Sequence, residues 1–180
     1  MALYVTRHGE TDWNRVGKIQ GIQDIPLNSV GRKEAKELKE KVAALPLDRM
    51  ISSPLSRAYQ TALIVNEDRH LPLTTDVRIR EEDYGDLEGK ECFQELFSLR
   101  GQYFVRYPHG EGYLDVAFRV FSFLDDLKKA DPASNILIVT HAGISRVINS
   151  YFHDMTNEEF SQFHLDNCQV IRYDFSDRDN

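Results

Sequence analysis

The chain has 180 residues, of which 28% are charged and 41% hydrophobic, and its formal net charge is −7 at pH 7. This length fits one domain with a substantial core, and the balanced composition excludes a disordered chain. No apolar stretch approaches the roughly 20 residues of a transmembrane helix, and the negative charge gives no general attraction to nucleic acid, so we expect neither membrane nor nucleic acid as a partner.

Strand-like sequence begins directly after Met1, which leaves no room for the charged and apolar regions of a signal peptide. We therefore expect a cytoplasmic protein. Cys92 and Cys168 lie far apart without metal-ligand spacing, which argues against a disulfide framework and against a structural zinc site. No repeat, low-complexity tract or linker divides the chain, so we expect a single domain over residues 1–180.

The first half of the chain predicts two strand-helix units separated by a surface helix. An apolar run at 2–6 and another at 47–51 read as strands, and each is followed by a loop and a helical pattern. Between them, the segment 29–45 carries Ala35, Leu38, Val42 and Leu45 at three- and four-residue steps beside a charged face. That spacing predicts an amphipathic helix.

The second half continues the same alternation. A helix is expected from about Tyr113 to Lys129, before Pro132, and its buried stripe is expected to consist of Leu114, Ala117, Phe118, Phe121, Leu124 and Leu127. A continuous apolar run at 135–140 suits a central strand, another helical pattern follows at 141–152, and 168–175 reads as a final strand. The predicted fold class is α/β, a three-layer sandwich whose central, mostly parallel sheet is flanked by helices.

Side chains that can carry positive charge follow each of the three strand-helix units. Arg7 and His8 follow the first strand, Arg57 follows the second, and His141 follows the third. The carboxyl ends of parallel strands meet at one edge of a sheet, where helix N-termini also present free amides. Each residue alone could be structural, but together with the amides at Gly143 they predict a pocket for a dianionic phosphoryl group.

His8 is expected to be neutral at physiological pH, because two guanidinium charges and a second imidazole lower its pKa. A neutral imidazole is a nucleophile, and its attack on phosphorus would give a phosphohistidine, which divides the transfer into two easier steps. The arginines already supply the positive charge that Mg²⁺ brings elsewhere, and no carboxylate cluster has metal-ligand spacing. We therefore expect no metal and no other cofactor.

Five segments resemble the successive motifs of the histidine phosphatase superfamily, in the branch that includes cofactor-dependent phosphoglycerate mutases and related phosphatases. They are RHGETDWN (7–14), QGIQDIPLNSVG (20–31), SSPLSRAYQTA (52–62), REEDYGDLEG (80–89) and THAG (140–143). The resemblance implies His8 as the phosphorylated nucleophile, and it implies the phosphate ligands Arg7, Arg57, His141 and Asn14. It also implies that Thr11 and Gln20 line the same loop, and that Ser53, Thr140 and Gly143 hold the loops in shape.

The proton donor for the leaving oxygen is expected in the segment 80–89. The family pattern places a carboxylate four residues before the glycine that is here Gly85, which selects Glu81. If the chain is extended around Glu82, adjacent side chains point to opposite faces, so that only one of the two carboxyl groups can reach the pocket. Glu82 is then expected to be a solvated surface residue.

The segment at about 89–110 is expected to form a short lid. It is shorter than the insertion of the mutases, and it combines five aromatic residues with Arg100 and Arg106. The aromatic residues could close over an apolar part of a substrate, or they could simply pack the lid onto the core. Glu111 follows the lid, but Gly112 stands where the family has serine, which weakens a functional role for Glu111.

These observations favour a metal-independent phosphomonoesterase that hydrolyses small phosphorylated metabolites through a phosphohistidine. A cofactor-dependent phosphoglycerate mutase is the alternative within the enzymes. A catalytically silent phosphate-binding module is the alternative outside them. The complete set of His8, Arg7, Arg57, Glu81 and His141 argues against the silent module, because a pure binder has no use for the acid. The sequence leaves the leaving group and the oligomeric state open.

Overall fold

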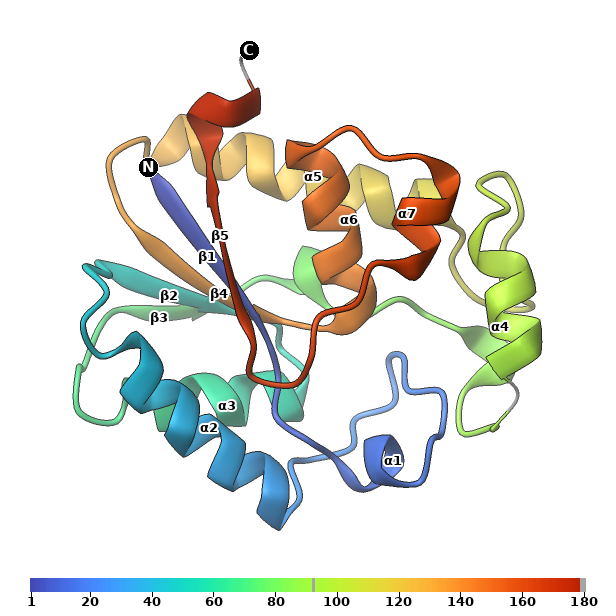
Figure 1. Ribbon diagram of the computed structural model, residues 1–180, viewed down its shortest axis with the longest axis horizontal. Helices are drawn as coiled ribbons and strands as arrows, with labels where there is room; N and C mark the ends of the chain where they lie inside the picture. The colour runs from blue at the N-terminus through green and yellow to red at the C-terminus, as the bar shows by residue number, and fades with distance from the viewer. Residues whose placement is uncertain (92, 179–180) are drawn as a thin grey trace.

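A computed structural model describes residues 1–91 and 93–178, so Cys92 lies outside the described residues. Its centre is a five-stranded sheet in the order β3-β2-β4-β1-β5 (Figure 1). The strands are β1 (Ala2–Arg7), β2 (Arg49–Ser52), β3 (Leu73–Thr75), β4 (Ile136–Thr140) and β5 (Val170–Asp174). All pairings are parallel except that of β5 with β1. The expected mostly parallel sheet is confirmed, and β4, which is buried throughout, occupies its middle.

Helices cover both faces of the sheet. Helices α2 (Ser29–Val42) and α3 (Ser56–Asn66) pack on one face, and α5 (Tyr113–Ala130) and α6 (Ala142–Phe152) pack on the other (Figure 1). Alternate residues of β1 serve the two layers, because Leu3 and Val5 join the α5 and α6 core while Ala2 and Tyr4 join the α2 and α3 core. The three-layer α/β sandwich is therefore confirmed.

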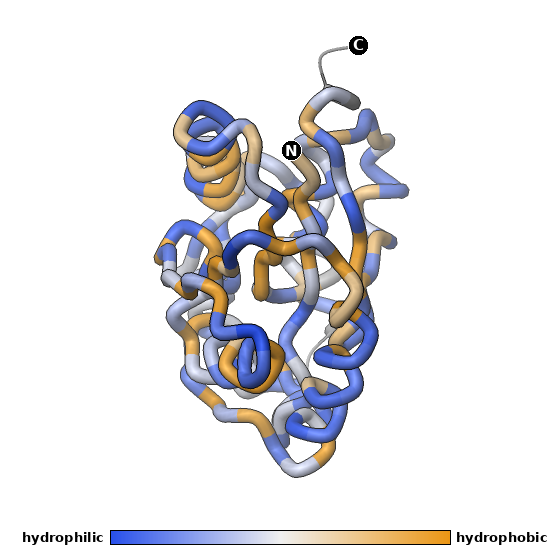
Figure 2. The backbone as a smooth tube through the Cα atoms, turned by 90° about the vertical axis from the view of Figure 1, so that its left-hand side faces the viewer, coloured by the Kyte–Doolittle hydropathy of each residue, from blue (hydrophilic) through white to orange (hydrophobic). Residues whose placement is uncertain are grey.

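The hydropathy of the outer helices is consistent with this layered arrangement. Figure 2 shows hydrophobic and hydrophilic stretches alternating along these helices. Within the described part of the chain, every helix is too short or too polar to cross a bilayer. The sequence did not predict the short elements, which lie in the connections. They are α1 (Asp12–Arg15), α4 (Phe93–Arg100), α7 (Asn157–Gln162), strand β3 and the 3₁₀ turns Val77–Ile79, Gly85–Leu87 and Phe175–Arg178.

The buried stripe of α5 differs from the prediction. Leu114 and Phe118 were expected inside, but they are 52% and 79% exposed. The helix carries apolar residues on more than one side, so the spacing alone permits two stripes, and packing against the sheet and α6 selects one of them. The selected residues are Val116, Ala117, Val120, Phe123, Leu124 and Leu127.

Candidate active site

The site lies where β1, β2 and β4 end. Arg7 of β1 is in register with Thr140 of β4, and the backbone N–H of His8 donates to the carbonyl of Thr140 at 3.0 Å. His8 and His141 follow this pair directly, so their rings meet with centroids 5.1 Å apart. Both side chains are buried. The parallel register thus brings together two histidines that are 133 residues apart in the chain.

The hydrogen bonds of His8 determine its tautomer. Nδ1 lies 2.7 Å from the carbonyl oxygen of Gly9, which can only accept, so Nδ1 carries the hydrogen. Nε2 then bears a lone pair, and it accepts a hydrogen bond from Nε of Arg57 at 3.3 Å. Burial, followed by the charges of Arg57 and Arg7, holds the pKa of His8 well below its usual range. The side chain is therefore a neutral imidazole with its basic nitrogen at the site.

His141 is also held neutral. Its Nε2 lies 2.8 Å from the hydroxyl of Ser53, while its buried Nδ1 has no hydrogen-bond partner among residues 1–91 and 93–178. Burial, then the charges of Arg57 and of His8, keep the pKa of His141 well below the ordinary value. The hydroxyl of Thr140 donates to the carbonyl of Ile79 at 2.8 Å, so it ties the end of β4 to a neighbouring loop.

Two arginines supply the positive charge next to these rings. Arg57 is fully buried, and its terminal nitrogens donate to the carbonyls of Gln23 and Gly21 at 2.9 and 2.7 Å. Burial lowers the pKa of Arg57 to about 10, so it stays charged at neutral pH. Arg7 donates to the carbonyl of Leu165 at 3.2 Å, and its buried Nε has no partner among the described residues. Backbone carbonyls thus hold both guanidinium groups against the histidines.

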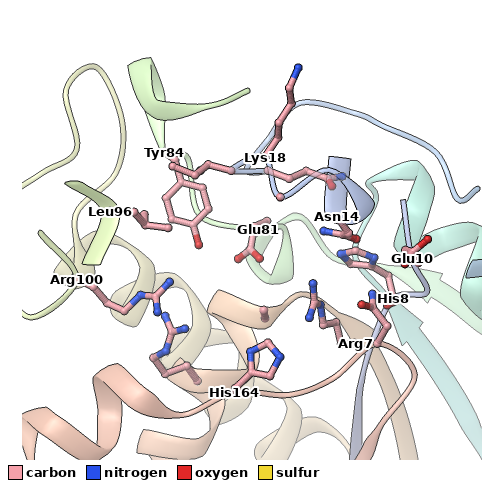
Figure 3. A pocket seen from close by; sticks show the side chains of 16 residues that line it. Arg7, His8, Glu10, Asn14, Lys18, Glu81, Tyr84, Leu96, Arg100 and His164 are labelled. Atoms are coloured by element: carbon pink, nitrogen blue, oxygen red, sulfur yellow. Dashed lines mark hydrogen bonds between the residues drawn. The ribbon is translucent and has the colours of Figure 1, made fainter. Parts of the chain in front are cut away.

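A cavity of about 380 Å³ opens in front of His8 (Figure 3). Of the residues expected from the sequence, those that line it are Arg7, His8, Asn14, Gln20 and Glu81. Arg57, His141 and Gly143 do not line it, but Arg57 and His141 contact His8, and Gly143 contacts Glu81. Thr11 is fully buried, caps helix α1 and is hydrogen-bonded to Gln20 at 2.6 Å. Thr11 therefore shapes the loop and does not face the cavity.

Glu81 lies between the two ends of the cavity (Figure 3). Its carboxylate accepts the backbone N–H of Gly143, in the first turn of α6, at 3.2 Å, and that of Glu82 at 3.0 Å. Arg119 supports the backbone of the same residue by donating to its carbonyl at 3.1 Å, and Glu111 binds Arg119 at 3.0 Å. Glu111, which the sequence left without a clear role, thus helps to fix the chain that carries Glu81.

The expectation for Glu82 is wrong. It is only 7% exposed, and its Oε1 lies 4.0 Å from Nη1 of Arg146. Burial and the charge of Glu81 raise the pKa of Glu82 to about 7. The rule of alternating faces fails because the residues around 81–84 form no strand and run between two 3₁₀ turns. Both carboxyl groups turn toward Gly143, where a Cβ atom would lie 2.5 Å from an oxygen of each.

Sequence reasoning missed most of the residues of the cavity wall. Arg146 is four residues after Ala142 on α6, and this spacing places both on one helix face, a signal that could have identified it. Asn167 also lines the cavity and donates to the carbonyl of His8 at 2.6 Å. No local pattern marks Asn167, because it lies in an irregular connection. The other missed residues are Glu10, Gly17, Lys18, Ile19, Tyr84, Leu96 and His164, whereas Arg100 lies in the lid that was expected from the sequence.

The segment 89–110 contributes helix α4 to the cavity wall. Leu96 is buried with Tyr84 and Tyr107, which supports the view that part of this segment packs onto the rest of the protein. Tyr103 likewise packs on Tyr113 with ring centroids 4.8 Å apart. Phe104 behaves differently and is 89% exposed. Tyr103 and Tyr107 therefore anchor this segment, while Leu96 and Arg100 face the cavity.

Comparisons with known proteins agree with the geometry. The chain is 39% identical over 140 residues to the uncharacterized phosphatase PhoE of Bacillus subtilis, which covers 78% of this chain and 71% of that protein. It is 31% identical over 183 residues to the probable phosphoglycerate mutase GpmB of Proteus mirabilis, covering 97% and 85%. The solved structure of YhfR from Bacillus stearothermophilus superimposes with a TM-score of 0.85 at 31% identity, covering 95% and 89%.

The sequence profile described as histidine phosphatase superfamily (branch 1) matches residues 3–180. This range contains the two neutral histidines, Arg7, the buried Arg57 and the carboxylate of Glu81, which lie at or directly beside the cavity. The solved structure superimposes on 95% of this chain, so it shares the overall fold that places these residues. The chain therefore belongs to the histidine phosphatase superfamily, branch 1.

Proposed function

We propose that the protein is a metal-independent phosphomonoesterase that hydrolyses small phosphorylated metabolites of the cytoplasm through a phosphohistidine. The observation that carries this proposal is the state of His8. Its Nδ1 is held by Gly9, and its neutral Nε2 lies among the guanidinium groups of Arg7 and Arg57. A group placed in this way is a nucleophile beside a strong anion site.

In the first step, Nε2 of His8 attacks phosphorus and the bond to the ester oxygen breaks. Glu81, in its protonated form, gives its proton to that leaving oxygen, and the alcohol departs. Arg57 would transfer its hydrogen bond from Nε2 of His8 to an oxygen of the phosphoryl group. Arg7, the free Nδ1 of His141 and Asn14 are expected to hold the other oxygens, with support from the amide of Gly143.

In the second step, the carboxylate of Glu81 removes a proton from water, and the water oxygen attacks the phosphohistidine. The bond between phosphorus and Nε2 breaks, which returns neutral His8 and releases inorganic phosphate. The same carboxyl group thus acts first as acid and then as base, as microscopic reversibility requires. The positive charge needed in both steps comes from Arg7 and Arg57, and no step assigns a role to a metal.

Hydrolysis is favoured over phosphoryl transfer to a second hydroxyl because the covering segment is short. A mutase must shield its phosphohistidine from water while the bisphosphorylated intermediate turns over. Here α4 and its flanking loops are the cover, and only about 18 residues separate Gly89 from Pro108. A catalytically silent binding module is disfavoured by the buried acid Glu81 beside the nucleophile.

The test is trapping of the phosphoenzyme. A quench in alkaline detergent during turnover of p-nitrophenyl phosphate by the wild-type protein should trap an acid-labile, base-stable phosphoryl group on His8, identified by mass spectrometry of the peptide at neutral to alkaline pH. His8→Ala should lose both this label and turnover. The exposed His153 offers a matched control, and His153→Gln should keep both. Turnover that persists at near wild-type rate in His8→Ala would overturn the proposal.

A further inference from the structure

Two arginines that the proposed mechanism does not use line the cavity together. Arg100 comes from α4 and Arg146 comes from α6. Figure 3 shows Arg100 and Leu96 on the side of the cavity opposite His8, with Glu81 in between. Burial, followed by the charge of Arg146, lowers the pKa of Arg100, so the two guanidinium groups are close enough to repel each other.

Contacts with neighbouring residues hold the guanidinium groups of both side chains at the cavity wall. Arg146 is buried, its Nε donates to the carbonyl of Phe163 at 3.4 Å, and its guanidinium lies 5.7 Å from the centre of the Phe160 ring. Arg100 donates from Nη1 to the carbonyl of Ser161 at 3.4 Å. The segment from 160 to 163 therefore supports both arginines from behind, which favours a defined geometry over two mobile surface charges.

The charges at this end of the cavity are unequal. Glu82 is the acid whose charge acts on both arginines, and its Oε1 is 4.0 Å from Arg146. Above the pKa of Glu82, about 7, one ionised carboxylate next to two guanidinium groups leaves an excess of one positive charge in a partly desolvated wall. A ligand group with one negative charge balances this excess, whereas a phosphate dianion exceeds it.

We propose that Arg100 and Arg146 bind a carboxylate of the substrate, so that the preferred substrates are phosphomonoesters that also carry a carboxylate. Each guanidinium presents paired N–H donors that match the two carboxylate oxygens. This inference rests on the proposed function, since it places the phosphoryl group of the same molecule at His8. A bound carboxylate would also link α4 to α6, and would thereby hold the cover against the core.

The test compares substrates that differ only in the proposed group. 3-Phosphoglycerate and glycerol 3-phosphate share the phosphorylated carbon and the neighbouring hydroxyl, and they differ by a carboxylate in place of a hydroxymethyl group. Release of inorganic phosphate should show kcat/KM at least about tenfold higher for 3-phosphoglycerate, the size of one well-placed charge-assisted hydrogen-bonded pair. A ratio near one would overturn the inference but leave the proposed phosphatase intact.

Variants of single arginines then test which residue is responsible for the preference for 3-phosphoglycerate. Arg100→Gln should reduce that ratio to about 2 or less, and Arg100→Lys should keep part of it, because charge remains but the paired donors are lost. Arg106 provides the control, since its side chain is 70% exposed and paired with Asp115 outside the cavity. Arg106→Gln should keep the wild-type ratio. Equal losses on both substrates in Arg100→Gln would show a structural role and refute the inference.

Binding keeps the inference testable even if the protein shows no turnover. The His8→Ala variant is titrated calorimetrically with 3-phosphoglycerate, with glycerol 3-phosphate and with 2,3-bisphosphoglycerate. The first compound should bind about tenfold more tightly than the second, and Arg100→Gln in the same background should abolish the difference. Equal affinities would refute the carboxylate subsite. Preference for the bisphosphate over 3-phosphoglycerate would show that the arginines select a phosphate and would equally refute it.

Discussion

His8 and His141 follow two residues that face each other in adjacent parallel strands, and their rings lie 5.1 Å apart. The strand register alone sets this separation, because the backbone of His8 is bonded to Thr140 at 3.0 Å. Burial, followed by the charge of Arg57, lowers the pKa values of both imidazoles. The proposed nucleophile His8 is therefore kept unprotonated by the same geometry that positions it.

Replacement of Glu81 should reduce the rate to an extent that depends on the leaving group, whereas replacement of Glu82 should not. Glu81→Gln should lower the rate on alkyl phosphates by about 10²-fold or more, the range of a lost general acid. The loss on p-nitrophenyl phosphate should be much smaller, because that leaving group needs little protonation. Glu82→Gln should cost little on either substrate in steady-state kinetics. If Glu82→Gln instead lowers the rate more than Glu81→Gln, and does so mainly on alkyl phosphates, then Glu82 is the general acid.

Gly143→Ala should damage catalysis more than folding. A Cβ atom there would lie 2.5 Å from oxygens of both Glu81 and Glu82, so the carboxyl group of Glu81 must shift. A displacement of about 1 Å at a reacting group can cost on the order of 10²-fold in rate, and we expect a loss of this size on alkyl phosphates. Gly101→Ala is the control, since nothing lies within 4 Å of its Cβ position. Wild-type rates in Gly143→Ala would contradict the assignment.

Glu82 should make the stability of the protein depend on pH. Its pKa is raised to about 7 in the folded state from the ordinary 4.5, so between these values the native protein binds a proton that the unfolded chain has released. The free energy of unfolding should therefore fall as pH rises through this window, by up to about 1.4 kcal/mol per pH unit. Glu82→Gln should flatten this slope in urea titrations at pH 5, 6 and 7. An unchanged slope would show that a group other than Glu82 binds this proton.

Activity should not depend on a divalent metal. Arg7 and Arg57 bring two fixed positive charges to the nucleophile, which is the contribution a metal makes in other phosphoryl-transfer sites. Turnover of p-nitrophenyl phosphate should survive exhaustive dialysis against EDTA, and added Mg²⁺ or Zn²⁺ should not raise it. Complete loss on chelation that Mg²⁺ or Zn²⁺ reverses would mean that the mechanism is misassigned.

Phosphoryl groups should pass mainly to water. With 3-phosphoglycerate and a catalytic amount of 2,3-bisphosphoglycerate, inorganic phosphate should appear faster than 2-phosphoglycerate, because the short cover around α4 admits water to the phosphohistidine. Both products are followed in one reaction by ³¹P NMR. Faster formation of 2-phosphoglycerate would favour the mutase alternative.

The sequence allowed the centre of the site to be located because its residues stand at strand ends. Arg7, His8 and His141 follow long apolar runs, and the rule that parallel strands share a carboxyl edge places them together without any three-dimensional information. The strands themselves were recognisable for the same reason. Strand β3, with three residues and no apolar run, gave no such signal.

The errors arose where local pattern and tertiary packing disagree. Glu82 lies in an irregular segment, so the two-residue period of a strand did not apply to it, and a charged residue was wrongly placed in solvent. Phe118 belongs to a helix with two possible apolar stripes, and only the position of α6 and the sheet decides between them. His164 and Asn167 enter the cavity from a connection whose course depends on β5 pairing with β1.

The order in which a ribosome delivers the chain has a consequence for that last connection. Asn167 lies 159 residues after His8 in the chain and holds its carbonyl, and the carbonyl of Leu165 holds Arg7, so residues near 165 complete the surroundings of the proposed nucleophile. β5 then joins the edge of β1 as the last strand of the sheet. During synthesis His8 therefore emerges before these neighbours, and its surroundings are complete only when the connection before β5 and β5 itself are in place.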